Sequence, residues 1–255
     1  MAANSEMYPN VNLPGFRKRK RSDDEILSFG FETVISLHIC PKDLPFIRAV
    51  QGITVGTTPD RKEFHIHRGL LRHFSDYFRT ALDGQFKEAL EGRFDLHEDS
   101  VDVFQAFHNL IYTNRLYDDT QTLPHRTIFE IIVFSDVRGI PALHNAAMNA
   151  LIFKVAHEWK LANGKYLTWI YDNTATNSPL RKFWVDFYAN TPMPRGSRIQ
   201  DFLRNADVQR NSTFFTDLVI ALKTKLDRHE PSSWVNEAEF ASKIDNCKYH
   251  VHKTV

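Results

Sequence analysis

The feature that most constrains the fold is a pair of strand patterns joined by a turn. Ile53 and Val55 lead into the turn-forming segment Gly56–Asp60, and Phe64 and Ile66 alternate with polar neighbours after it. Alternation with a period of two places apolar side chains on one face of a strand, and a turn between two such runs favours a hairpin. The pattern therefore predicts a β-hairpin with one buried face.

Helical patterns and one further strand follow the hairpin. Ser75 is placed to cap a short helix that carries Phe78 and ends at Gly84. A third strand is expected around residues 94–96, and Asp99 is placed to cap a longer helix with apolar residues at helical spacing. We therefore expect a small sheet packed against helices, which is an α+β arrangement.

Two more helices are predicted to form a helical hairpin. The first carries the apolar residues Ile128, Phe129, Ile132 and Val133 and ends near Gly139, and Pro141 suits the first turn of the second. Farther along, Ser178 and Pro179 mark another helix start. An apolar stripe follows this start: Leu180, Phe183, Trp184, Phe187 and Tyr188. The stripe has two interpretations, a buried core or a surface that binds a ligand or a partner helix.

These patterns divide the chain into five segments. They are a disordered basic tail (1–25), an N-terminal extension with a strand pattern at 27–39 (26–46), a compact domain (47–155), a helical extension (156–230) and a flexible tail (231–255).

The formal net charge of +1 gives no bulk field that would attract nucleic acid or a membrane. Cys40 and Cys247 lack paired spacing for zinc or a disulfide framework, so we expect no metal, no cofactor and a reduced nuclear or cytoplasmic setting. The first ten residues show no signal-peptide pattern, and no apolar run approaches the roughly 20 residues that span a bilayer.

The segment 64–78 closely resembles the signature of the BTB/POZ domain family. The family pattern runs from an apolar strand end through His-Lys/Arg, two positions, Leu, three positions, Ser, one position and Tyr-Phe. The matching residues, for which the resemblance implies a structural role, are His67, Leu71, Ser75, Tyr77 and Phe78. Further segments resemble the family in the same order: 86–88, 94–99, 112–113 and 136–143.

The resemblance covers residues 47–155 and implies the BTB/POZ fold, a small sheet flanked by α-helices, here with a helical C-terminal extension. The extension resembles that of stand-alone fungal BTB proteins. The family usually carries an Asp at the start of its first strand, important to the charged pocket of its dimer, and Ala49–Gly52 contains no acid. A homodimer of this chain therefore stays an open expectation.

The resemblance implies binding to other proteins as an adaptor or scaffold. Phe86 and Glu88 resemble the motif by which BTB adaptors hold the cullin scaffold of ubiquitin ligases; the alternative for Phe86 is a loop residue packed in the local core. The other functional hypothesis is a nuclear regulator that assembles on transcription or chromatin partners without a ligase role. A basic run typical of nuclear import favours it: Arg17, Lys18, Arg19, Lys20 and Arg21.

The residues argue against metal binding, catalysis and sequence-specific binding to nucleic acid. His65 and His67 lie two apart on a predicted strand, so both could face a metal, but a structural His67 and a surface His65 are the favoured interpretation. The sequence contains no phosphate loop, no nucleophile elbow and no His-Glu-x-x-His, so we expect no enzyme activity. Without a recognition motif we also expect no sequence-specific binding to nucleic acid.

Overall fold

The computed structural model describes residues 49–84, 88, 91–117, 123–158, 164–191, 212–230 and 236–252. The predicted basic tail, the strand pattern at 27–39, the basic run and Phe86 lie outside these residues. The described chain forms two compact units, which divide between Ala147 and Met148.

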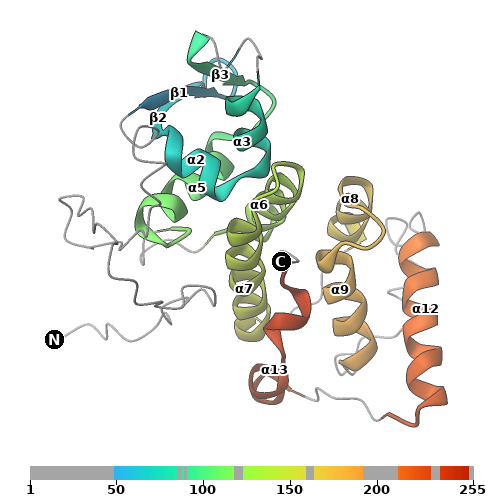
Figure 1. Cartoon of the computed structure of the whole chain (residues 1–255). Helices are drawn as coiled ribbons and strands as arrows, with labels where there is room; N and C mark the ends of the chain where they lie inside the picture. The colour runs from blue at the N-terminus through green and yellow to red at the C-terminus, as the bar shows by residue number, and fades with distance from the viewer. Residues whose placement is uncertain are drawn as a thin grey trace, which may run out of the picture. The chain divides into compact units, whose positions relative to one another are not determined.

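The first unit contains a three-stranded sheet. Its strands are β1 (Val50–Val55), β2 (Lys62–His67) and β3 (Arg93–Leu96), in the order β2-β1-β3. β1 pairs antiparallel with β2, which confirms the predicted hairpin, and parallel with β3. Figure 1 shows these strands together, close to the helices that follow them in the sequence.

The helices of this unit for which bounds are described lie between and after the strands in the sequence. They are α2 (Arg68–Phe74), α3 (Asp76–Asp83), α5 (Val101–Thr113), α6 (His125–Val137) and α7 (Pro141–Glu158), the last of which runs on into the second unit. Side chains from both the sheet and the helices are buried together, including Ile53, Phe64, Phe104 and Phe107. The α+β fold class is therefore confirmed.

The helix boundaries agree with local capping rules at two of the predicted positions. Ser75 caps α3, which ends before Gly84. Ser178 caps α9 (Pro179–Asn190), and Pro179 occupies its first turn. The prediction that Asp99 caps α5 is wrong. The cap position is Ser100, which makes no side-chain capping hydrogen bond. The Asp99 carboxylate pairs instead with Arg138.

The second unit is helical. Besides α9 it contains α8 (Gly164–Asn173), α12 (Ser212–Asp227), α13 (Glu237–Lys243) and a 3-10 helix, η2 (Asn246–Tyr249). α9 packs against α8, α12 and η2. Phe183, Trp184 and Phe187 of α9 are buried, so the aromatic stripe of this helix is core. Arg181 is buried beside them and donates hydrogen bonds to the carbonyl oxygens of Tyr171 and Thr174.

The expectation of a flexible tail over 231–255 is wrong for residues 236–252. Asn236 caps α13 by accepting a hydrogen bond from the backbone N–H of Glu239. Phe240 and Tyr249 are buried and lie edge-on to Phe187 and Phe183 respectively. These two widely spaced aromatic anchors have no helical or strand period, which explains why periodicity did not find them.

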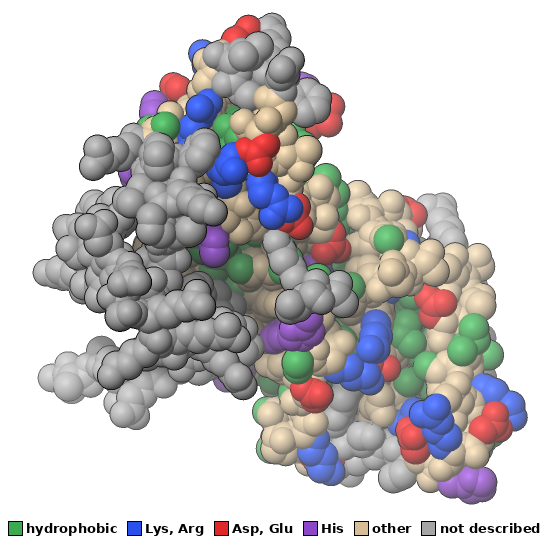
Figure 2. All heavy atoms as spheres, viewed as in Figure 1, with side chains coloured by type: hydrophobic (Ala, Val, Ile, Leu, Met, Phe, Trp, Pro, Cys, Tyr) green, Lys and Arg blue, Asp and Glu red, His purple; other side chains and the backbone are tan. Residues whose placement is uncertain are grey.

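Charge is mixed on the surface of both units. In Figure 2, basic and acidic side chains lie interspersed on the visible face, in keeping with a formal net charge of +1. Among the described residues, no helix combines the length with the apolar composition that crossing a bilayer requires.

Candidate interaction site at the signature helices

His67 ends β2 and precedes α2, where it is held by Tyr112 of α5. The backbone N–H of His67 donates to the Tyr112 hydroxyl oxygen at 3.2 Å, and His67 Nδ1 lies 2.8 Å from the same atom. Burial raises the pKa of Tyr112, against a smaller lowering by the hydrogen bond from His67, so the hydroxyl stays protonated. It can therefore accept from the amide and donate to Nδ1 at once. This contact fixes the turn from strand to helix.

Leu71 and Phe78 point into the core and are completely buried. The Phe78 ring lies edge-on to Phe94 of β3, with centroids 5.3 Å apart, and stacks parallel to Phe107 of α5. Aromatic pairs in these arrangements add to the stabilisation that burial provides. α3 is thereby packed on both the sheet and α5.

Ser75 links α3 to the end of α6. Its hydroxyl accepts a hydrogen bond from the backbone N–H of Phe78 at 3.2 Å and donates one to the carbonyl oxygen of Arg138 at 2.7 Å. The backbone N–H groups of Asp76 and Tyr77 donate to the carbonyl oxygens of Gly139 and Arg138. The first turn of α3 is therefore bound to the junction between α6 and α7.

Gly139 is required at this junction for two reasons. Its φ of +59° lies in the left-handed region that glycine adopts without strain. A Cβ atom at this position would also lie 3.1 Å from the Cβ of Asp76. The close approach allows the backbone bonds between α3 and the junction.

The Arg138 side chain joins three elements. Its guanidinium pairs with the Asp99 carboxylate at 2.5 Å and lies 4.5 Å from the centroid of the Tyr77 ring. Both side chains of the ion pair are largely removed from solvent, so the pair is only weakly screened. Tyr77 remains 38% exposed, so one face of its ring is held by the cation while the residue still reaches solvent.

The outer face of α3 forms a continuous candidate surface. We define the α3 surface as its exposed residues Tyr77, Arg79, Thr80 and Asp83. Arg79 pairs with Asp76 at 2.9 Å, and Asp83 pairs with Arg72 of α2. The surface thus offers an aromatic ring among charged groups of both signs, an arrangement suited to contact with another protein.

Of the two residues of the cullin-type motif, only Glu88 is described. It has helical backbone and is exposed, shortly after the end of α3.

In the part of the chain that the structure describes, neither histidine of β2 belongs to a group of three metal-binding side chains. His65 is exposed and lies 3.8 Å from Glu63, while His67 is engaged with Tyr112. Among the described residues, side chains suited to a metal gather elsewhere, at Cys247, His250 and His252. The search of the sequence for paired cysteines missed this group, although the Cys-x-x-His-x-His spacing was there to be found.

Comparison with known proteins agrees with the signature. Residues 53–146 match the family model of the BTB/POZ domain. Within the curated proteins, the chain is 31% identical over 85 residues to the Kelch-like protein 21 of Danio rerio. The match covers 33% of this chain and 13% of that protein, so the chain spans only a small part of its relative.

Proposed function

Since residues 53–146 form a BTB/POZ domain, we propose that the chain works as an adaptor that joins other proteins into a complex. The observation that carries this proposal is the α3 surface. Most residues of the signature make contacts inside the fold. Its exposed residue is Tyr77, whose ring is held by Arg138 and surrounded by charged side chains. Tyr and Arg are the residue types enriched at the energetic centres of protein interfaces.

We further propose that the partner of this surface is a scaffold of the cullin type. Glu88 is exposed just beyond α3, and the sequence places Phe86 two residues before it. An apolar anchor beside an acid would give such a scaffold a pocket contact together with an orienting charge.

A nuclear regulator without a ligase role is the second candidate, because the basic run over residues 17–21 is typical of an import signal. In that case the BTB/POZ domain would assemble on transcription or chromatin partners, or with a second copy of this chain.

The test is binding of the full chain to a cullin amino-terminal domain, measured by light scattering and titration calorimetry. We expect a complex that is lost on Phe86→Ala and on Glu88→Lys, and weakened at least tenfold by Tyr77→Ala. Glu230→Lys makes the same charge change at an exposed position of the second unit and should leave binding unchanged. Circular dichroism checks that each variant is folded.

Failure of the wild-type chain to bind would contradict the cullin proposal and favour the nuclear one. The same light-scattering traces report whether the chain alone is a monomer or a dimer. Replacing residues 17–21 by Ala would then be followed by the nuclear fraction of the protein in cells, which should fall if the run is an import signal.

A further inference from the structure

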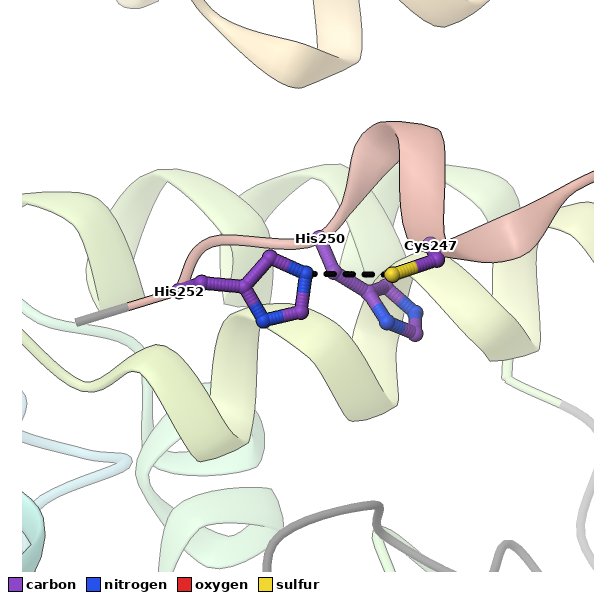
Figure 3. Close-up of side chains that lie close together, drawn as sticks. All are labelled: Cys247, His250 and His252. Atoms are coloured by element: carbon purple, nitrogen blue, oxygen red, sulfur yellow. Dashed lines mark hydrogen bonds between the residues drawn. The ribbon is translucent and has the colours of Figure 1, made fainter. Parts of the chain in front are cut away.

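Three metal-binding side chains meet at the end of the second unit. Cys247 lies in η2, His250 directly follows this helix, and His252 comes two residues later. The backbone N–H of His250 donates to the carbonyl oxygen of Cys247 at 3.2 Å, which brings these two residues close together. One ligand atom from each of the three residues lies within 4.8 Å of the others. Figure 3 shows the Cys247 sulfur facing the His252 ring, with His250 beside them.

The backbone that carries this Cys-His cluster is anchored on α9. Asp245 starts η2 by accepting a hydrogen bond from the backbone N–H of Cys247 at 3.0 Å. The buried Tyr249 donates its hydroxyl proton to Asp186 at 3.0 Å, and Lys248 pairs with the same carboxylate at 2.7 Å. The segment that carries the cluster is therefore fixed by its contacts with α9.

A hydrogen bond to Asn149 of α7 orients the ring of His250. Its Nε2 lies 2.9 Å from Asn149 Oδ1, and the side-chain N–H of Asn246 donates to that same oxygen at 3.1 Å. Because an amide oxygen can only accept, Nε2 carries the proton and the lone pair of the neutral ring is on Nδ1. Metal-binding histidines typically donate their other N–H to an oxygen in this way, which fixes the ring and its tautomer.

Cys247 and His252 already contact each other through the atoms that would bind a cation. The Cys247 Sγ lies 3.2 Å from His252 Nε2, and both side chains are exposed, which leaves a route for an ion from solvent. In a tetrahedral zinc site with bonds of about 2.3 Å to sulfur and about 2.0 Å to nitrogen, such atoms are roughly 3.5 Å apart. The Cys247–His252 pair would therefore open slightly, and the ligand atom of His250, which lies within 4.8 Å of both, would move closer.

We propose that Cys247, His250 and His252 form a binding site for a divalent transition metal, with zinc as the ion and water as the fourth ligand. A thiolate and two imidazoles are ligands that zinc prefers, and this ion undergoes no redox reaction with the thiol. Binding deprotonates Cys247: the S–H bond breaks, the sulfur–zinc bond forms, and the proton leaves to solvent. Three protein ligands with an open fourth position distinguish this site from closed four-ligand structural zinc sites.

The cation would join the last described residues to the rest of the second unit. His252 lies beyond η2 and is hydrogen-bonded to Cys247. A metal shared with His250 would connect it through Asn149 to α7. Because only the folded state offers the three ligands together, zinc should raise the melting temperature of the second unit.

The test is cobalt and zinc binding to the full chain, stripped with a chelator and kept reduced. We expect one Co²⁺ per chain, an absorption band from thiolate-to-cobalt charge transfer and visible bands typical of tetrahedral cobalt. Zinc added in one equivalent should displace the cobalt and abolish these bands. Zinc affinity is then measured by competition with a coloured chelator.

Cys247→Ser should remove the charge-transfer band, and His252→Gln should weaken zinc binding at least tenfold. Two matched controls should bind as the wild type does: Cys40→Ser removes the other cysteine, and His157→Gln removes an exposed histidine of α7. Cys247 and His252 are exposed, so their substitution should leave the fold intact, which circular dichroism checks. A charge-transfer band that survives Cys247→Ser, or no bound metal in the wild type, would overturn the proposal.

Asn149 provides a test of the orientation of His250. Asn149→Ala should keep the charge-transfer band but lower zinc affinity about 10- to 100-fold, the usual effect of removing the partner of a ligating histidine. Asn149→Asp should restore the affinity, since a carboxylate accepts the same two hydrogen bonds. Equal zinc affinity in the wild type and in Asn149→Ala would contradict the role given to Nδ1 of His250.

Discussion

The Ser75 hydroxyl donates a hydrogen bond to the carbonyl oxygen of Arg138, 63 residues away in the sequence, at 2.7 Å. The same hydroxyl caps α3 by accepting from the N–H of Phe78. Ser75 is completely buried, so water cannot replace either of these hydrogen bonds. One side chain thus both starts a helix and ties it to the end of another.

Ser75→Ala should therefore lower the free energy of unfolding by about 2 kcal/mol, from the loss of the cap and of one of the two hydrogen bonds to the Arg138 carbonyl, which keeps the bond from the Tyr77 N–H. Ser100→Ala is the matched control, because Ser100 occupies the cap position of α5 without a side-chain capping bond. It should cost less than about 0.5 kcal/mol. Urea unfolding measures both, and equal losses would contradict the double role of Ser75.

The Arg138–Asp99 pair should contribute more than an exposed ion pair. A double-mutant cycle with Arg138→Ala and Asp99→Ala should give a coupling energy of about 2 kcal/mol, as for a charged hydrogen bond that is shielded from water. The control cycle is Lys223→Ala with Asp227→Ala, an exposed pair within α12. Its coupling should be about 0.3–0.5 kcal/mol. Similar values in urea unfolding for the two cycles would show that burial adds nothing at Arg138.

Gly139→Ala should destabilise the protein more than Gly92→Ala does. The two glycines share a left-handed backbone, with φ of +59° and +66°, so both substitutions carry the same strain of about 1–2 kcal/mol. At Gly139 the new methyl group would also press on the Cβ of Asp76, whereas at Gly92 it would meet open space. Thermal unfolding should show the larger loss at Gly139, and equal losses would argue against a tight approach of α3 to the junction.

His108 should make stability depend on pH. Burial, assisted by the charge of Lys62, lowers the pKa of His108 below its ordinary value of 6.5. The unfolded chain therefore binds a proton more readily than the folded one, so stability is fully present above pH 6.5 and is lost as the pH falls toward the pKa of the folded state.

His108→Gln should flatten this fall, which urea midpoints at a series of pH values below 6.5 would measure. His157→Gln, which changes an exposed histidine, is the control and should keep the slope of the wild type. Parallel slopes for the wild type and His108→Gln would contradict the lowered pKa of His108.

Local patterns were enough for most of the helices and strands. The β1–β2 hairpin follows from its alternation and its turn residues, and the helix starts at Ser75 and at Ser178 follow from capping. Asp99 shows where such rules fail. It is a good capping residue by type, but a partner 39 residues away takes its carboxylate, so Ser100 holds the cap position.

By itself, the sequence determined the α+β class and the BTB/POZ signature, because alternation, helical spacing and caps act between residues close along the chain. Only the tertiary structure decided that Ser75 and Asp99 both meet Arg138, that Tyr249 reaches Asp186, and that Asn149 orients His250 toward Cys247. These contacts join residues 39 to 101 positions apart. Their partners depend on how helices pack, which no local pattern encodes.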